Sequence, residues 1–230
     1  MAPKNFLKPL LSYKQKAMSK TRLATLVAAL CLPLFLAGAG QPAPPRLIEF
    51  SAEQQAELSK VNAYLNAIHT LKSNFVQLGP EGQLVQGVLF IEKPGRMRFE
   101  YQPPSPLLIV ATGGRLYVRN AKLNTVSNYS LSASPLGILL DDQVNLMRNS
   151  AILGVEQSGD SLTVRARTSD NRSQSNIALV FSWPNVELRQ WIVKDNQGGL
   201  TTVALTGVQS GIALDESLFA VPTKAPPKFP

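Results

Sequence analysis

The sequence holds very few of the side chains from which active sites are built. Its 230 residues include one cysteine, Cys31, and one histidine, His69. A zinc site or a Cys–His nucleophile needs several such residues in the folded chain, and Cys31 lies in a leader segment. The sequence also has no G-x-S-x-G elbow, no P-loop and no calcium loop with acids at alternate positions. We therefore expect a binding protein rather than an enzyme, without catalytic residues, metal or cofactor, and a structural or surface role for His69.

A basic surface is also missing once the leader is set aside. The formal net charge is +8, but six of the 23 basic residues and none of the 15 acidic residues lie in the first 22 positions. The rest of the chain therefore has 17 basic residues against 15 acidic ones. Such a chain offers no basic footprint for nucleic acid, so we expect no nucleic-acid partner.

Residues 1–39 have the three parts of a secretory signal peptide. A basic region is followed by the apolar run 23–36 and by the small residues 37–39. The run has 14 residues, fewer than the roughly 20 of a membrane-spanning helix, and an uncleaved anchor is the alternative. Cys31 follows Leu30, which is not the small residue that precedes a lipid-attachment cysteine. We expect a soluble mature chain without a disulfide or a lipid anchor.

After the leader, the sequence predicts a linker, one folded domain and a tail. Residues 40–50 are Pro-rich and predict an extended linker, and the domain spans 51–222, before a Pro-rich tail over 223–230. Ser51 and Gln54 have the spacing of a capping box and open a helix over 52–71. Its apolar stripe consists of Leu58, Val61, Leu65, Ile68 and Leu71.

The rest of the domain alternates between apolar and polar residues with a period of two, which is typical of strands. We expect strands over 74–78, 83–93, 96–101, 107–111, 115–120, 124–130, 152–157, 162–167, 176–181, 187–194 and 201–208. Their short connections predict hairpins, and hence one large, curved antiparallel sheet. One or two short helices interrupt it over 134–147, where Ser134 suits a helix cap and Pro135 the first helical position.

The hairpin over 87–101 has two different faces. Pro94 and Gly95 form its turn, and the strand after them alternates strictly. Met97, Phe99 and Tyr101 point to one side and Arg96, Arg98 and Glu100 to the other. One side of the sheet is therefore apolar and aromatic at this hairpin.

The chain from Phe75 to Tyr129 resembles the LolA type of periplasmic lipoprotein carrier. The run KPGRMRFEY, from Lys93 to Tyr101, carries most of the resemblance. The weaker matches are Phe75, Gln77, Gly87, Leu89, Ile109, Val110, Gly113, Gly114, Leu116, Tyr117, Val118, Ser134, Pro135, Leu136 and Phe219 to Pro222. The resemblance implies a mainly β fold with α: an unclosed, strongly curved antiparallel half-barrel with an N-terminal helix and a mid-chain helical lid.

The resemblance also implies a function. Such carriers are monomers of the periplasm that take acylated lipoproteins from an inner-membrane ABC transporter and pass them to an outer-membrane acceptor. The alternative is an envelope-stress signalling module of related half-barrel fold, which binds lipidated or membrane proteins. A secreted esterase is a third alternative, against which the missing nucleophile elbow speaks.

The resemblance places candidate site residues on the predicted elements. The residues expected to line the lipid-binding cavity share strand parity, and are Leu89, Ile91, Met97, Phe99 and Tyr101. The residues expected to close it from the lid are Leu136, Ile138, Leu139 and Leu140. Family members often have an arginine where this sequence has Lys93. The resemblance implies that this arginine holds the lid by hydrogen bonds. We expect Lys93 or Arg96 to act as this latch, and the alternative for Lys93 is a solvated turn residue.

Overall fold

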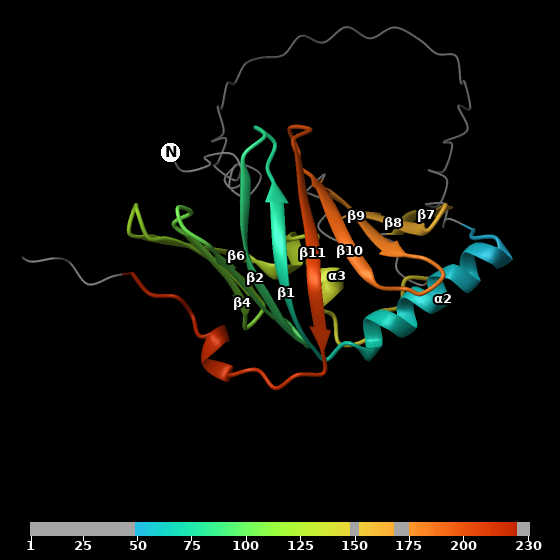
Figure 1. Cartoon of the computed structure of the whole chain (residues 1–230), viewed down its shortest axis with the longest axis horizontal. Coiled ribbons are helices and arrows are strands. Elements are labelled where there is room, and N and C mark those ends of the chain that lie inside the picture. The colour runs from blue at the N-terminus through green and yellow to red at the C-terminus, as the bar shows by residue number, and fades with distance from the viewer. Residues whose placement is uncertain (1–48, 148–151, 168–174, 225–230) are drawn as a thin grey trace, which may run out of the picture.

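The structure, a computed structural model, describes residues 49–147, 152–167 and 175–224 (Figure 1). The predicted signal peptide, most of the predicted linker and the end of the predicted tail lie outside these residues. Within them, eleven strands form one antiparallel sheet with the order β6-β5-β4-β3-β2-β1-β11-β10-β9-β8-β7. The predicted fold class is confirmed.

Two meanders make up the sheet. The strands are β1 (Thr70–Leu78), β2 (Leu84–Glu92), β3 (Arg96–Tyr101), β4 (Leu107–Thr112), β5 (Arg115–Asn120), β6 (Thr125–Ser130), β7 (Ile152–Ser158), β8 (Ser161–Arg167), β9 (Asn176–Ser182), β10 (Leu188–Lys194) and β11 (Leu200–Ser210). Pairing of β1 with β11 joins the meander β1–β6 to the meander β7–β11. The predicted strands are confirmed, but this pairing of the first strand with the last was not predicted.

The N-terminal helix is shorter than predicted. Helix α2 (Ala52–Ala67) begins with the expected capping box, in which Ser51 and Gln54 exchange hydrogen bonds of 3.2 and 3.0 Å. It ends at Ile68, which is extended, and not at Leu71. Leu71 belongs to β1 and pairs with Ile91 of β2. The helical spacing of apolar residues continues to Leu71, but strand pairing determines the structure at this position. His69 lies between α2 and β1, with its side chain exposed as a surface role requires.

The mid-chain insertion contains less helix than its apolar residues suggest. It holds the 3₁₀ turn η1 (Leu131–Ala133) and the single-turn helix α3 (Gly137–Leu140). Ser134 is not the cap of α3, because the helix begins after Leu136; the Ser134 hydroxyl accepts instead from the Leu136 N–H over 3.3 Å. The prediction that Pro135 opens a helix is therefore wrong, and a short loop carries the lid residues.

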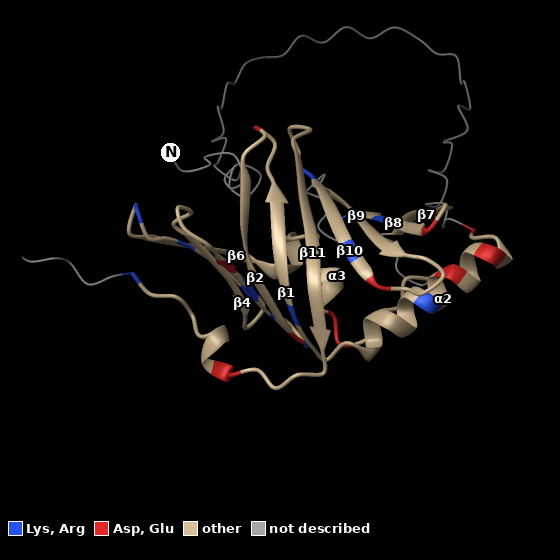
Figure 2. Cartoon of the chain, in the orientation of Figure 1, with Lys and Arg blue, Asp and Glu red and all other residues tan. Residues whose placement is uncertain are grey.

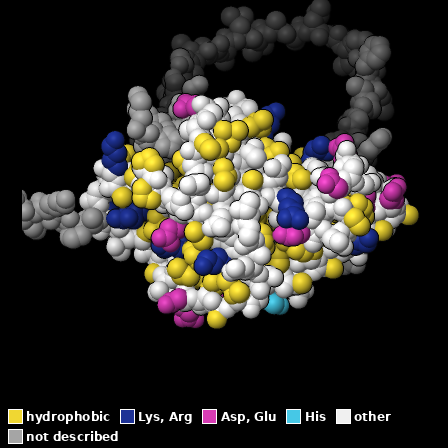
Figure 3. All heavy atoms as spheres, in the orientation of Figure 1, with side chains coloured by type: hydrophobic (Ala, Val, Ile, Leu, Met, Phe, Trp, Pro, Cys, Tyr) yellow, Lys and Arg dark blue, Asp and Glu magenta, His cyan; other side chains and the backbone are white. Residues whose placement is uncertain are grey.

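The sheet curves around α3, and α2 lies beside β7 (Figure 1). The inner face of the sheet and these helices share one continuous apolar core. Basic and acidic residues both occur on the sheet, and α2 also carries residues of both signs (Figure 2). The outer face is more polar, although Val76, Leu78, Leu84 and Leu200 are exposed there near the ends of β1, β2 and β11 (Figure 3).

The last part of the described chain crosses the outer face of the first meander. After β11 it contains the 3₁₀ turn η2 (Glu216–Phe219), which contacts β3 and β4. Arg98 donates to the Leu218 carbonyl over 3.2 Å, and Arg119 donates to the Thr223 carbonyl over 3.0 Å. We call this segment, residues 211–223, the C-terminal arm.

Candidate functional site

Aromatic side chains from three strands form the centre of the inner face. Phe75 of β1 meets Phe99 and Tyr101 of β3 edge-on, with ring centroids 5.1 Å apart in both pairs. Phe99 in turn meets Trp191 of β10 at 6.1 Å. Edge-to-face contacts of this kind stabilise beyond the buried area alone. The two meanders are thus joined by aromatic contacts as well as by the pairing of β1 with β11.

The predicted cavity residues all point inward. None is more than 6% exposed, and pairing sets Leu89 opposite Phe99 and Ile91 opposite Met97. Most of the inner face is filled, and a cavity of about 100 Å³ remains. Its apolar wall includes Phe99, Ile109, Leu116, Val118, Trp191 and Val203. Of the five predicted residues, Phe99 alone lines this cavity, and the other four lie in the packed core beside it.

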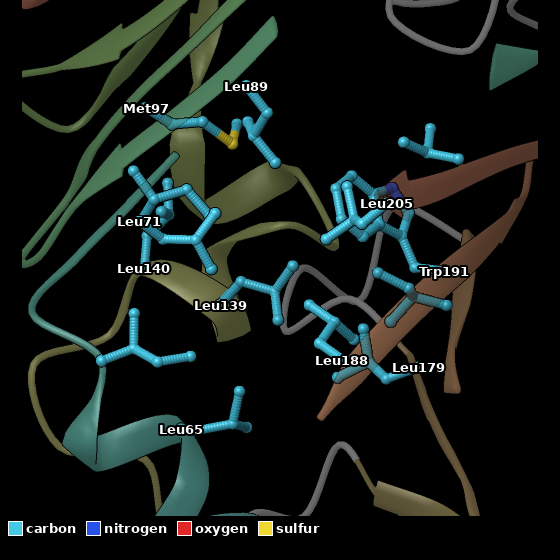
Figure 4. Close-up of a cluster of buried hydrophobic side chains, with 14 of the residues drawn as sticks. Leu65, Leu71, Leu89, Met97, Leu139, Leu140, Leu179, Leu188, Trp191 and Leu205 are labelled. Atoms are coloured by element: carbon cyan, nitrogen blue, oxygen red, sulfur yellow. The ribbon is translucent and has the colours of Figure 1, made fainter. Parts of the chain in front are cut away.

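Two residues of the predicted lid are part of this packed core. Leu139 and Leu140 of α3 are 4% and 2% exposed. Leu140 lies beside Leu71, below Met97, and Leu139 points towards Leu188 on the other side of the hollow (Figure 4). The lid therefore brings together side chains of both meanders.

The two other predicted lid residues are half-buried. Leu136 lines the cavity of about 100 Å³. Ile138 lines a second, wider hollow of about 490 Å³, together with Asp141, Asp142 and Arg167. The four lid residues therefore do not share one environment: two are buried in the core, and the others lie at the borders of two separate hollows.

Backbone hydrogen bonds attach the lid to two hairpin turns. The Gly95 N–H, in the turn between β2 and β3, donates to the Leu140 carbonyl over 2.9 Å. The Leu131 N–H donates to the carbonyl of Gly114, in the turn between β4 and β5, over 2.9 Å. Each of these two attachments is a single main-chain hydrogen bond.

Lys93 does not make the predicted latch. Its Nζ donates over 3.0 Å to the carbonyl of Leu65, in the last turn of α2, where a cation is favourable. Burial lowers the pKa of Lys93, and the carboxylates of Asp141 and Asp142 after the lid oppose this effect. Lys93 is therefore linked to the lid through charge and not through a hydrogen bond.

Arg96, the other candidate latch, lies on the outer face. It pairs with Glu92 at 2.8 Å, and its guanidinium lies over the Phe219 ring, 5.6 Å from the centroid. The prediction that Arg96 forms a hydrogen bond with the lid is therefore wrong. Its side chain stabilises the position of the C-terminal arm instead.

A buried polar pair lies at one side of the cavity. The Tyr101 hydroxyl donates to Oε1 of Gln77 over 2.9 Å, and burial raises the pKa of Tyr101. Gln77 is 2% exposed and lines the cavity.

Among the described residues, no cluster of three His, Cys, Asp or Glu side chains is placed to hold a metal ion. No helix in the described ranges has the length and apolarity to cross a membrane.

A family model described as outer membrane lipoprotein carrier protein LolA matches residues 66–222. This chain belongs to the LolA family. The match begins at the end of α2 and covers every strand, the lid and most of the C-terminal arm. The cavity and the lid described above are therefore parts of a LolA domain.

The relatives that this chain matches are distant from it. An uncharacterized protein of Rickettsia prowazekii is 29% identical over 162 residues, which are 70% of this chain and 76% of that protein. The outer-membrane lipoprotein carrier protein of Shewanella halifaxensis is 26% identical over 205 residues, 84% of this chain and 88% of the carrier. A solved LolA superfamily protein of Nitrosomonas europaea is 11% identical, with a TM-score of 0.42, and the match covers 71% of this chain and 97% of that structure.

Sequence reasoning missed two residues of α2 that hold the chain after the lid. Nδ2 of Asn66 donates to the Val144 carbonyl over 3.0 Å, and Oδ1 of Asn66 accepts from the Val144 N–H over 2.8 Å. Oδ1 of Asn62 accepts from the Leu146 N–H over 2.9 Å. Their signal in the sequence is a pair of asparagines, four residues apart, beside the apolar stripe of the helix. Asparagine has a low helix propensity, and residues four apart lie on the same face of a helix.

Proposed function

We propose that this chain is a periplasmic carrier. In this proposal it encloses the acyl chains of lipoproteins released from the inner membrane and delivers them to the outer membrane. The observation that carries the proposal is the burial of Leu139 and Leu140 against an inner face that is otherwise apolar. A lid of leucines on a short, weakly attached loop is suited to exchange with other apolar groups. The family's description as lipoprotein carriers supports the same cargo.

The size of the cavity supports a lid that must move. A volume of about 100 Å³ is below the roughly 300–1,000 Å³ of pockets that hold drug-sized ligands. Exposing Leu139 and Leu140 would cost roughly 1.5–3 kcal/mol each, and each buried CH₂ of an acyl chain returns about 0.8 kcal/mol. Roughly four to eight CH₂ groups therefore offset the opening of the lid. Loading exchanges one apolar burial for another, so handover needs only a small difference in free energy.

The remaining parts of the proposal follow from this exchange. The signal peptide of residues 1–39 would direct the chain to the periplasm, where the linker 40–50 and the tail 223–230 flank the carrier domain. The chain would act as a monomer between an inner-membrane ABC transporter and an outer-membrane acceptor. It would use no catalytic step, since both loading and release are transfers of apolar surface.

Native mass spectrometry of the mature protein purified from the periplasm tests the cargo. We expect a fraction of the protein to carry a triacylated lipoprotein. A complex with a membrane protein that lacks acyl chains, and no lipoprotein, would contradict the carrier and favour the signalling alternative.

A release assay with spheroplasts tests the lid. The mature wild-type protein should release newly made lipoproteins into the medium, and Leu139→Glu should release fewer, since a buried leucine becomes a charge. The matched control is Leu123→Glu, because Leu123 is 64% exposed and lies outside the lid. Equal release by the two variants would argue against a lid that closes on Leu139.

A further inference from the structure

The wall of the cavity contains one buried amide in an orientation that its neighbours set. Gln77 pairs in register with Val85 of β2 and with Val203 of β11, so its side chain points to the inner face. Its Oε1 is held by the Tyr101 hydroxyl at 2.9 Å. Its Nε2 has no hydrogen-bond partner within the described part of the chain. The amide therefore has two unpaired N–H donors beside the cavity, while its oxygen accepts from Tyr101.

Most other polar groups around the cavity are already in use. The Ser134 hydroxyl accepts from the Leu136 N–H, and the Ser175 hydroxyl donates to Asn196. Oδ1 of Asp195 accepts from two backbone N–H groups of its own turn. The hydroxyl of Thr201 is a further polar group, on the same face as Val203. Gln77 is thus a fixed donor in a wall that is mainly apolar.

An unpaired donor beside an apolar cavity is unfavourable, and a ligand that supplies an acceptor removes this cost. An acyl group linked as an ester or an amide has an apolar chain and one strong acceptor, its carbonyl oxygen. We propose that Nε2 of Gln77 donates to the carbonyl oxygen of a bound acyl group and so sets how far the chain enters the cavity. This inference rests on the proposed function and names the group that the carrier would recognise.

A matched pair of lipids separates the carbonyl from the chain. The probes are 1-palmitoyl-lysophosphatidylcholine and its 1-O-hexadecyl ether, which differ by one carbonyl oxygen. Binding to the mature protein is measured by displacement of bis-ANS. Wild type should bind the ester about 2- to 12-fold more tightly, as one net hydrogen bond implies. In Gln77→Leu the two affinities should become equal, mainly through weaker binding of the ester.

The same variant tests the source of the carbonyl. A synthetic triacylated cysteine peptide supplies the ester and amide carbonyls of a lipoprotein. Weaker binding of both this peptide and the lyso-ester by Gln77→Leu would show that any acyl carbonyl is read. Weaker binding of the peptide alone would show that the lipoprotein carbonyls are read. Equal binding of ester and ether by wild type, combined with unchanged binding of the peptide by Gln77→Leu, would overturn the inference.

Two further measurements guard against a merely structural effect. Gln77→Leu removes the acceptor of Tyr101, so Gln77→Leu is also made together with Tyr101→Phe, which removes the unpaired hydroxyl. The stretching band of a ¹³C-labelled ester carbonyl should lie at lower frequency in wild type than in this double variant. An identical band in both proteins would overturn the inference. Failure of wild type to bind either lipid would instead contradict the carrier function itself.

Discussion

The side chain of Asn66 pairs with both main-chain groups of Val144, as a neighbouring β-strand would. The two bonds measure 3.0 and 2.8 Å, and Asn62, one turn earlier, accepts from the Leu146 N–H. Val144 and Leu146 are themselves buried, at 4% and 0% exposure. Helix α2 thus holds the segment that follows the lid. Movement of the lid is therefore limited to the residues between this segment and the two hairpin turns to which the lid is bonded.

Asn66→Ala should loosen the hold of α2 on this segment. Both main-chain groups of Val144 lose their partners, which corresponds to a loss of about 1–3 kcal/mol. We expect faster hydrogen exchange at the Val144 amide and stronger bis-ANS binding by the empty protein. Ser59→Ala is the control, because Ser59 is exposed on the same helix and the change also introduces alanine. Equal exchange rates in the two variants would mean that Asn66 does not anchor the lid.

The aromatic centre of the inner face should depend on the absence of a side chain at Gly87. A Cβ there would overlap the backbone oxygen of Glu100 and lie 2.8 Å from the Phe75 ring. Gly87→Ala should therefore cost about 1–3 kcal/mol, the usual cost of overpacking. Gly154→Ala on β7 is the control, since a Cβ at Gly154 meets no atom within 4 Å. Urea unfolding measures both, and equal stabilities would contradict the close packing of Phe75.

Most strands could be predicted because they have one buried face and one more exposed face. Residues 96–101 were assigned without error, since Met97, Phe99 and Tyr101 alternate with charged residues. Leu71 was assigned wrongly to a helix because its spacing of three from Ile68 fits a helix, while its spacing of four from Phe75 also fits the inward positions of a strand. Only the register of β1 with β2 decides between the two, and that register depends on residues twenty positions away.

The candidate site was predictable in part, for the same reason. Strand parity placed Met97 and Phe99 on the inner face, and two leucines of the lid, Leu139 and Leu140, are buried. The partners of Lys93 and Asn66 could not be predicted, because their hydrogen bonds go to backbone groups 28 and 78 residues away. Such contacts leave no periodic signal, since any residue can supply the backbone group.

Lys93 should report the position of the lid through its pKa. Burial lowers this pKa, and the carboxylates of Asp141 and Asp142 raise it. Replacing both acids by asparagine should therefore lower the pKa of Lys93 further, as should an acyl probe that moves the lid away. NMR titration of the lysine ¹³Cε signal measures the shift.

Glu81→Gln is the control for this titration, because it removes an exposed acid in another turn. It should leave the Lys93 signal unchanged. A pKa that stays constant when the two acids after the lid are replaced would contradict their place beside Lys93. Because the folded pKa lies below that of the unfolded chain, stability should also rise with pH through the interval between the two values.

The C-terminal arm should contribute stability through one aromatic side chain. Phe219 is 3% exposed, lies against β3 and β4, and is covered by the Arg96 guanidinium. Phe219→Ala should cost about 3 kcal/mol, the lower end for a buried phenylalanine, because the arm can shift to fill part of the space. Val221→Ala is the control, since Val221 is 49% exposed and should change stability by less than about 0.5 kcal/mol.

Limited proteolysis locates the effect of Phe219→Ala on the arm. Without the ring, the arm keeps its hydrogen bonds from Arg98 and Arg119, but the first is only partly buried and the second is exposed to water, so each is worth less than a fully buried bond. We expect cleavage between Gly211 and Thr223 to become faster in Phe219→Ala, while bis-ANS binding at the inner face stays unchanged. Slower unfolding or an unchanged cleavage rate would show that the arm is held by its backbone contacts and not by the ring.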